Sequence, residues 1–505
     1  MLGRGVKIGL LCAMLVAFMG KVLPQTTPGM FDNYSGSSFI GLNPSSMSTA
    51  FVYDDFSLAS VSLGFDNSFA YLPSNKLLPS LAAVFSNQPW PTYTGVQPGK
   101  SYYFKYDEST QPCSLYQSFD VALPSLMKTF GGIHTIGFSL RGRFCTSVDR
   151  MPWEIPVLIT ESLEYEDMHH IRYTSEGMRV AAMGWTEADI AYSTLLFDDG
   201  VMRMSVGGTG KLLMGMTGLS VNTDALDYVV ENKDSLYFYA LDGDIQMALP
   251  FSNQYNFHGN SQLEVEKPTV KGWGVGFDAG FTLVNKKETS IRRKPRSACE
   301  DSPVYYYWRL GFSVLDIGGI WFGNNTAMLG LVGESVGVDL REFKGVTSVA
   351  EALNLLDNTV DGQASGVDTL SGFFMGLPTS MSLQYDVNLT PDVYCNVSWI
   401  HPISLWLYEN AVEREPVLSL TPRYETRYFG VSMPVTLYDY NYLTTGVFVR
   451  LGPLCFGTND LLSLTGLSNT RSADFTVTLR LRLDRGDCLF NPLRDACGDG
   501  YRYSH

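Results

Sequence analysis

The fold class is decided near the end of the chain, by the stretch Asp474-Phe-Thr-Val-Thr-Leu-Arg-Leu-Arg-Leu-Asp484. Its apolar side chains alternate with polar ones: Phe475, Val477, Leu479, Leu481 and Leu483 against Thr476, Thr478, Arg480 and Arg482. Successive residues of a β-strand point to opposite faces of a sheet. The stretch therefore predicts a strand with one apolar face and one charged face.

The same alternation recurs along most of the chain from about Ser57 onward. It is clearest in 136–143, 273–283, 306–314, 381–387 and 447–452. A soluble β-sandwich and a membrane β-barrel both produce such a pattern. Large aromatics on the apolar faces, with Gly, Ser and Arg on the polar ones, favour the barrel. We predict an all-β, transmembrane antiparallel β-barrel of about 14 strands, an even number as bacterial barrels require.

The composition agrees with a wall that faces lipid, although a glycine-rich soluble β protein would also fit it. Of 505 residues, 17% are charged and 13% aromatic, against roughly 25% charged in soluble domains. The net charge of -15 argues against a nucleic-acid-binding surface, which needs a basic face.

The first residues are typical of an export signal. Arg4 and Lys7 precede an apolar run from Ile8 to Met19, which is too short to span a bilayer as a helix. No later uncharged apolar run is long enough for a transmembrane helix, so the chain would span a membrane as strands. We expect a bacterial outer-membrane protein divided into a signal peptide (1–25), a plug-like segment (26–52), a barrel (53–485) and a C-terminal tail (486–505).

Two segments depart from the strand pattern. Residues 26–52 are rich in Ser, Gly, Pro and Asn and predict an ordered loop or plug, with Asn43 and Pro44 as plug candidates. Ser348-Val-Ala-Glu351 matches a capping box and predicts a short helix, which could pack within a loop or fold into the barrel mouth as a gate.

Charged residues on the polar faces are the candidate functional positions. As lumen-facing, ligand-binding candidates we select Arg141, Arg143, Arg203, Lys211, Asp278, Arg309, Asp386, Arg450, Arg480 and Arg482. Buried charges need partners or water. These residues could form a ladder of ion pairs that stiffens the wall, or line a polar passage or ligand site. We expect no cofactor and no metal.

The chain has eight cysteines, including Cys12 in the signal. None forms a C-x-x-C pair, which argues against a zinc ribbon. Cys488 and Cys497 in the tail could pair as a disulfide in an oxidising compartment. Cys455 lies in an apolar strand and is expected to be a buried thiol.

Several local motifs suggest other chemistry. Gly333-Glu-Ser335-Val-Gly337 matches a nucleophile elbow, but no oxyanion motif accompanies it, so we predict no enzyme. The phosphate-loop-like 206–211 is better explained as a strand with Lys211 on its polar face. His169-His170 fits a solvated loop better than a metal site. The basic cluster from Lys286 to Arg296 predicts a loop, which could be simply solvated, contact lipopolysaccharide phosphates if it faces outward, or hold a periplasmic partner if it faces inward.

Several segments together resemble a family of Gram-negative outer-membrane barrels labelled a domain of unknown function. This family is distantly similar to FadL-like transporters and to barrels of type IX secretion. The resemblance rests on Leu42–Ser45, Gly184–Glu187, Gly210–Gly215, Gly272–Asp278, Leu310–Gly318, Leu377–Thr379, Leu420–Tyr424 and Arg450–Gly457. It implies the fold and the outer membrane. Ser45 stands where the FadL-like plug usually has alanine after Asn-Pro.

Two functions follow as hypotheses. The first is passive transport of a small hydrophobic molecule across the outer membrane through a plugged lumen. The second is a structural or docking barrel that anchors a surface or secretion complex. The expected partners are outer-membrane lipid and lipopolysaccharide, with a hydrophobic ligand or a secreted or surface protein according to the hypothesis, and no nucleic acid.

Overall fold

The computed structural model describes residues 32–74, 105–107, 112–161, 163, 166–248, 269–287, 303–324, 326–342, 355, 372–403 and 410–485. The signal segment, the tail with Cys488 and Cys497, and the basic cluster beyond Lys287 lie outside these residues. Of the helix predicted after Ser348, only Leu355 is described. Among the described residues, no helix is long and apolar enough to cross a membrane.

One antiparallel sheet contains nearly all strands of the described chain. In sequence order these are β1 (Val52–Asn67), β4 (Cys113–Ala122), β5 (Ser125–Phe130), β6 (His134–Met151), β7 (Arg172–Ser175), β8 (Met178–Asp198), β9 (Met202–Asn232), β10 (Ser235–Ala248), β11 (Gly272–Lys286), β12 (Tyr306–Phe322), β13 (Thr326–Asp339), β14 (Phe373–Gly376), β15 (Ser380–Thr390), β16 (Val393–Pro402), β17 (Val417–Glu425), β18 (Phe429–Ser432), β19 (Val435–Tyr438), β20 (Tyr442–Thr445), β21 (Val447–Leu451), β22 (Leu454–Thr458) and β23 (Ser472–Asp484).

The remaining described elements are short. β2 (Ala70–Tyr71) and β3 (Lys105–Tyr106) form a separate pair, and the helices are η2 (Gly36–Gly41), η3 (Pro44–Thr49), α3 (Glu154–Glu161), η6 (Glu166–Met168) and α5 (Leu461–Leu464).

The sheet closes into a barrel because β1 pairs with β23 on one side and with β4 and β5 on the other. The stretch at Asp474–Asp484 is therefore the closing strand. Phe475, Leu479 and Leu481 are exposed, whereas Thr476 and Arg480 are buried. The predicted two-faced strand is confirmed, with its buried polar face turned into the lumen.

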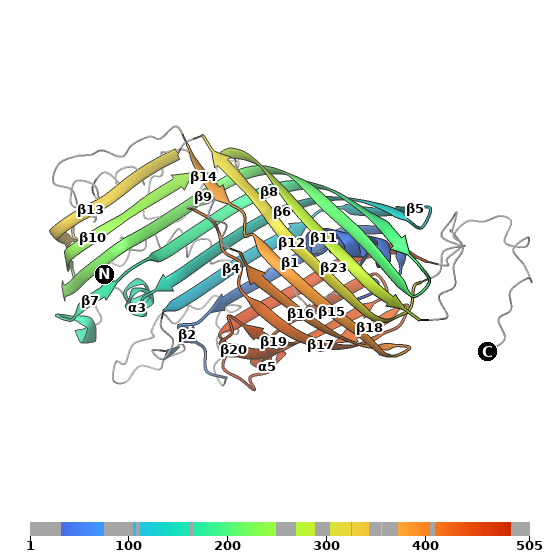
Figure 1. Cartoon of the computed structure of the whole chain (residues 1–505). Coiled ribbons are helices and arrows are strands. Elements are labelled where there is room, and N and C mark those ends of the chain that lie inside the picture. The colour runs from blue at the N-terminus through green and yellow to red at the C-terminus, as the bar shows by residue number, and fades with distance from the viewer. Residues whose placement is uncertain are drawn as a thin grey trace, which may run out of the picture.

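The expected count of 14 strands is wrong. When collinear pieces such as β4 with β5 are taken as one strand, the described part of the sheet has 16 strands. The reason lies in β9, which is 31 residues long. Its first half pairs with β11 and its second half with β10, and β10 in turn pairs with β13. Figure 1 shows these strands extending beyond the rest of the barrel at one end.

The outer surface of the barrel is strongly apolar. Large side chains on it include Trp273 at 63% exposed, Val275 at 66% and Ile190 at 64%. The inward face carries Ser, Thr and charged residues, such as Ser139 and Asp189. A polar lumen inside an apolar wall is the reverse of a soluble barrel and is the arrangement that lipid requires.

The two ends of the barrel differ. At one end, which we call the turn end, β8 and β9, β15 and β16, β17 and β18, and β21 and β22 are joined by short turns. β1 begins and β23 ends at this same end, as their register shows. Longer connections, including 152–171 and 403–416, lie at the opposite end, the loop end, although the connection between β11 and β12 at the turn end is also longer.

Residues 32–51, which we call the N-terminal segment, lie within the barrel near its turn end. Phe39, Ile40 and Met47 are each at most 2% exposed, and the short blue helices of Figure 1 are surrounded by strands. η3 begins at Pro44, where a proline needs no backbone partner, and the Asn43 side chain caps it by accepting from the Ser45 amide at 3.2 Å.

Candidate functional site in the barrel lumen

A continuous ion-paired network crosses the middle of the lumen. We call it the central network; its members are Asp120 of β4, Arg141 and Arg143 of β6, Glu187 of β8, Lys211 of β9, Asp278 of β11 and Asp316 of β12. Alternation along β4, β6, β8, β9 and β11 turns their members inward, an irregularity of the β11–β12 ladder turns Asp316 inward, and neighbouring strands bring these side chains together.

Asp316 is the centre of this network. Arg143 donates to it in a bidentate manner, from Nη1 to Oδ1 at 2.9 Å and from Nη2 to Oδ2 at 3.1 Å. The Lys211 Nζ lies 2.5 Å from Asp316 Oδ1 and 2.8 Å from Asp278 Oδ2. Removing one partner from such a buried set would leave a charge without compensation, at a cost of about 3–5 kcal/mol. The network therefore holds four strands in one arrangement.

The other half of the network joins β4, β6 and β8. Arg141 pairs with Asp120, and its Nη1 lies 3.3 Å from Glu187 Oε1. Glu187 also accepts from the Trp185 indole at 2.8 Å, and the Arg143 guanidinium lies 4.9 Å from the centre of that ring. An aromatic side chain thus faces the charged layer from the side of the loop end.

A second charged group lies at the turn end. Asp386 of β15 accepts from Arg309 at 2.9 Å, from Arg423 at 2.6 Å and from the Tyr306 hydroxyl at 2.7 Å. The Tyr306 hydroxyl also contacts Asn33 Oδ1 at 2.8 Å. This group therefore ties the wall to the start of the N-terminal segment.

Asp32 anchors the same segment to the opposite wall. The Arg450 Nε donates to its carboxylate at 2.5 Å, and Arg480 donates to the Tyr34 carbonyl at 3.2 Å and to the Ser38 hydroxyl at 3.1 Å. Burial alone would raise the pKa of Asp32, but Arg450 and Arg480 lower it from its ordinary 3.8 to about 2. Asp32 therefore remains ionised and paired near neutral pH.

The middle of the N-terminal segment is held by hydroxyl groups. The Thr282 hydroxyl lies 2.6 Å from Ser45 Oγ and 3.0 Å from Ser46 Oγ. Ser205 of β9 and Ser313 of β12 donate to the segment's carbonyls at 2.9 and 2.7 Å. A Cβ at Gly207 would lie 2.6 Å from the Ser45 amide nitrogen, so this wall position needs glycine. Side-chain contacts, not ladder pairing, keep the segment in place.

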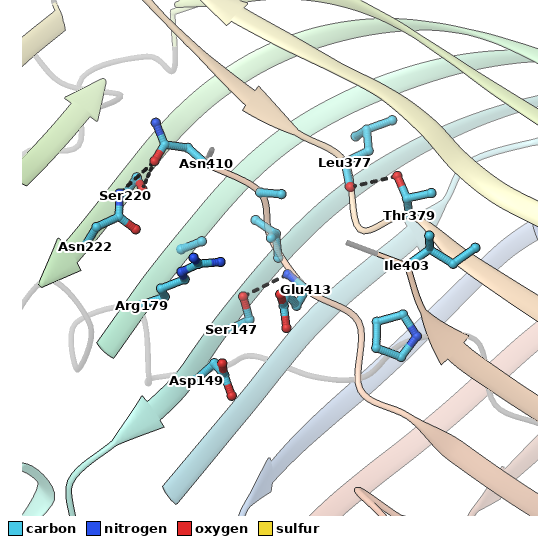
Figure 2. A pocket seen from close by; sticks show the side chains of 14 residues that line it. Ser147, Asp149, Arg179, Ser220, Asn222, Leu377, Thr379, Ile403, Asn410 and Glu413 are labelled. Atoms are coloured by element: carbon cyan, nitrogen blue, oxygen red, sulfur yellow. Dashed lines mark hydrogen bonds between the residues drawn. The ribbon is translucent and has the colours of Figure 1, made fainter. Parts of the chain in front are cut away.

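A second segment crosses the lumen toward the loop end. Residues 410–416, the crossing segment, run from the β9–β10 wall to β19. Asn410 begins it, bound by Ser220 at 2.9 Å and Asn222 at 2.8 Å. Its end is held where the Asp439 amide donates to the Pro416 carbonyl at 2.9 Å. Figure 2 shows Asn410 and Glu413 of this segment meeting side chains of the wall.

Further contacts fix the crossing segment along its length. The Val412 amide donates to the Gly376 carbonyl at 3.3 Å, and the Glu413 amide donates to Ser147 Oγ at 2.9 Å. Arg414, which is 3% exposed, donates to Ser380 Oγ at 2.9 Å. The segment thus lies across the loop-end side of the lumen.

A cavity of about 50 Å³ lies against the crossing segment (Figure 2). Polar residues on its walls include Ser147, Arg179 and Asn222. Its apolar lining includes Leu377 and Val412, which also belong to the buried apolar cluster that contains Trp185. Sites for small organic molecules usually measure about 300–1,000 Å³, so in this state the cavity is too small for one.

The structure brings the candidate residues together in part. Arg141, Arg143, Lys211 and Asp278 meet in the central network, whereas Arg309 belongs to the Asp386 group. Arg450 and Arg480 instead hold the N-terminal segment.

Arg203 lies apart from these groups, whereas the Arg482 guanidinium lies 4.7 Å from the centre of the Tyr34 ring in the N-terminal segment. Arg203 bonds the Gly132 carbonyl at 3.4 Å, and Arg482 pairs with Asp484 at 2.8 Å. Asn43 and Pro44 lie in the N-terminal segment as expected. A ligand-binding role for any of these residues stays a prediction.

Sequence reasoning found Asp278 and Asp386 but missed the other acidic partners, Asp120, Glu187 and Asp316, and the crossing segment. Asp316 has a φ of 57° at an irregularity of the β11–β12 ladder, so the strand alternation does not predict that it points inward. Glu187 could have been found, because it shares the period-two face of Trp185 and Asp189. Arg414 lies in a connection, where periodicity carries no signal.

The structure also places the residues of the other motifs noted in the sequence. Ser335 is a residue of strand β13 with a φ of 60°, and not the tip of a strand–turn–helix. Lys211 is an inward residue of β9, as predicted. Cys455 is buried with a free thiol, as is Cys145. The described residues contain no group of three or more His, Cys, Asp or Glu arranged to hold a metal ion.

Comparison with known proteins gives one family and distant structural neighbours. A family model described as "Family of unknown function (DUF5723)" matches residues 80–459. No curated protein matches. Among solved structures, the Ralstonia pickettii toluene transporter TbuX is 9% identical over 89% of this chain and 94% of its own, with a TM-score of 0.38. A Pseudomonas aeruginosa FadL homologue is 8% identical over 92% of this chain and 100% of its own, with a TM-score of 0.28.

Proposed function

We propose that this chain, which belongs to the family of unknown function DUF5723, lies in the bacterial outer membrane and passively transports a small hydrophobic molecule through its lumen. The observation that carries the proposal is the N-terminal segment, which occupies the turn end of the lumen without being paired into the wall. A wall that served only as a structural element would not need such an internal segment. An element held by side-chain contacts can move while the barrel stays closed.

The surface supports a membrane location. The apolar wall, with exposed residues such as Trp273 and Val275, would contact lipid and the acyl chains of lipopolysaccharide. Bacterial barrels have short periplasmic turns and longer outer loops. By that rule the turn end faces the periplasm, the loop end faces outside, and the N-terminal segment acts as a plug on the periplasmic side.

Apolar side chains at the loop end support a hydrophobic cargo. Ala181, Leu377 and Val412 belong both to the cavity lining and to the buried apolar cluster beneath it. A ligand that enters the cavity would therefore meet apolar side chains first and the central network next. Because each member of that network has an ion-pair partner, we interpret this arrangement as a closed state in which passage needs the internal segments to shift.

The test is uptake into lipid vesicles that contain the purified protein. An uncharged aromatic probe should enter faster than in protein-free vesicles, and an anionic analogue of the same size should not. Equal entry of both probes, or entry no faster than in protein-free vesicles, would refute the transport proposal.

One observation favours a second function, a docking barrel for a surface or secretion complex. The lumen is sealed by ion pairs, and β10 and β13 extend past the other strands at the loop end. Chemical cross-linking in intact cells would test this, because a docking barrel should give one stoichiometric protein partner that is lost when the β10–β13 pair is removed.

A further inference from the structure

The crossing segment contains a carboxyl group that the transport proposal does not use. Glu415 is 9% exposed and contacts Asp66 at the end of β1, which is 5% exposed. Glu415 Oε1, Asp66 Oδ1 and the Tyr442 hydroxyl are all buried without a conventional hydrogen-bond partner. Two carboxylates in contact repel one another, whereas one proton between them would form a hydrogen bond.

We propose that residues 410–416 are an outer gate of the lumen, held shut by a proton shared between Glu415 and Asp66 and released when that proton is lost to solvent. The proposal rests on the proposed function for the meaning of the gate. The structural claim itself is separate, since it concerns only whether this segment opens and what controls it.

The surroundings of Glu415 disfavour its ionised form. Titratable groups on the neighbouring elements interact electrostatically with Glu415. They are Asp66 of β1, Tyr116 of β4, Tyr438 of β19, Asp439 of the β19–β20 turn, Tyr442 of β20 and Asp474 of β23. All are acidic or phenolic. The described carboxyl groups do not form a metal site, so a proton is the simplest neutralising partner.

Burial raises the pKa of Glu415 well above its ordinary value, and the Asp66 carboxylate raises it further. A group whose pKa is raised in the closed state stabilises that state below its ordinary pKa. The stabilisation is lost as the pH rises through the raised pKa. The gate should therefore be shut in acid and loosen as the pH increases.

The remaining contacts make the segment a discrete element. Asn410 at one end and Arg414 near the other are bound by side chains of the wall, and the stretch between them has one backbone pairing, at Gly376. To leave the lumen the segment must break these side-chain hydrogen bonds and this one pairing, but no extended strand ladder. Beneath it, Cys145 is 1% exposed and packs in the same cluster as Val412.

Cys145 supplies a readout that does not depend on transport. In the full-length protein with the other cysteines replaced by alanine, a polar maleimide added from the loop end should reach Cys145 only when the crossing segment has opened. Comparing variants at the same pH cancels the ionisation of the thiol itself.

The key variant is Glu415→Gln, whose amide donates to Asp66 at every pH. The ratio of wild-type to variant labelling rate should rise by about tenfold per pH unit between the ordinary pKa of a glutamate and the raised pKa of Glu415 in the closed state, and should level off above the raised pKa, as loss of a single proton requires. Asp66→Asn replaces the other carboxyl group of the pair with an amide. With two variants, the conclusion does not depend on the correct folding of either one alone. Glu413→Gln, the same change two residues away, is the matched control and should label as wild type does.

A ratio that stays constant across pH for both Glu415→Gln and Asp66→Asn would overturn the proton-held gate. Asn410→Ala removes the hydrogen bonds to Ser220 and Asn222, and should speed labelling at every pH. Unchanged labelling in that variant would overturn the crossing segment as the cover. Gated labelling without uptake of the aromatic probe would refute the transport function and leave the gate standing.

Discussion

Replacing Thr282 with valine should weaken the docking of the N-terminal segment without disturbing the barrel wall. Thr282 is fully buried, and valine keeps its shape while removing its hydroxyl. That hydroxyl makes close contacts with Ser45 at 2.6 Å and Ser46 at 3.0 Å, and a long one with Asn43 at 3.5 Å.

The magnitude follows from those contacts. Each of the two close hydrogen bonds contributes about 1 kcal/mol net, so the variant should weaken docking of the segment by about 2 kcal/mol. A change of that size raises the population of the undocked state by about 30-fold. The segment should remain mostly docked, because Ser205 and Ser313 still hold its carbonyls.

Hydrogen exchange followed by mass spectrometry measures this population. Amides of 36–49 should exchange about 30-fold faster in Thr282→Val than in the wild type, provided that exchange follows the opening equilibrium. The control is Thr476→Val, because Thr476 is equally buried but bonds Ser62 within the wall at 3.2 Å. If the amides of 36–49 exchange at the wild-type rate in Thr282→Val, side-chain docking of the segment is refuted. An equal increase of their exchange rate in Thr476→Val would refute it as well.

Three further changes test the wall and the charged groups. Asp316→Asn should destabilise the barrel by about 3 kcal/mol in thermal unfolding, whereas Asp227→Asn, at an exposed ion pair, should cost less than about 1 kcal/mol. Phe138→Arg on the outer face should cost about 2–4 kcal/mol in a bilayer, while Leu467→Arg, at a position that is 77% exposed beyond the strands, should be nearly neutral in the same folding assay. Because the pKa of Asp32 is lowered to about 2, its contribution should persist above about pH 4 and fade as the pH falls toward 2; Asp32→Asn should lose this pH dependence in hydrogen exchange of 32–38.

The alternation of apolar and polar residues predicted the barrel wall well, because each residue of a strand faces either lipid or the lumen according to its position. The outward apolar and inward polar sets of β23 and β11 follow directly from the period of two. The pattern failed at bulges. Tyr306, which alternation assigns to the apolar outer face, is buried against Asp386, and Tyr307 is exposed instead, because the β11–β12 register shifts next to Lys286.

Strand count and lumen contents depend on long-range pairing, which alternation does not encode. The period-two pattern of β9 does not show that its pairing partner changes from β11 to β10 along its length. The crossing segment is equally hidden, because Asn410 and Arg414 lie in a connection and find their partners only through the closed barrel. The lumen-facing arginines were recognised as candidates, but most of their carboxylate partners were not.

A disulfide that locks the N-terminal segment tests the central claim most directly. In a background without native cysteines, Ser45→Cys with Thr282→Cys joins two positions whose hydroxyl oxygens are 2.6 Å apart. The control pair, Ser60→Cys with Thr478→Cys, joins hydroxyl positions 2.7 Å apart within the wall.

Our account predicts that oxidation of the first pair reduces uptake of the uncharged aromatic probe to the level of protein-free vesicles, that a reductant restores it, and that the wall pair changes nothing. Undiminished uptake through the locked protein would contradict the claim that this segment must move for the lumen to open.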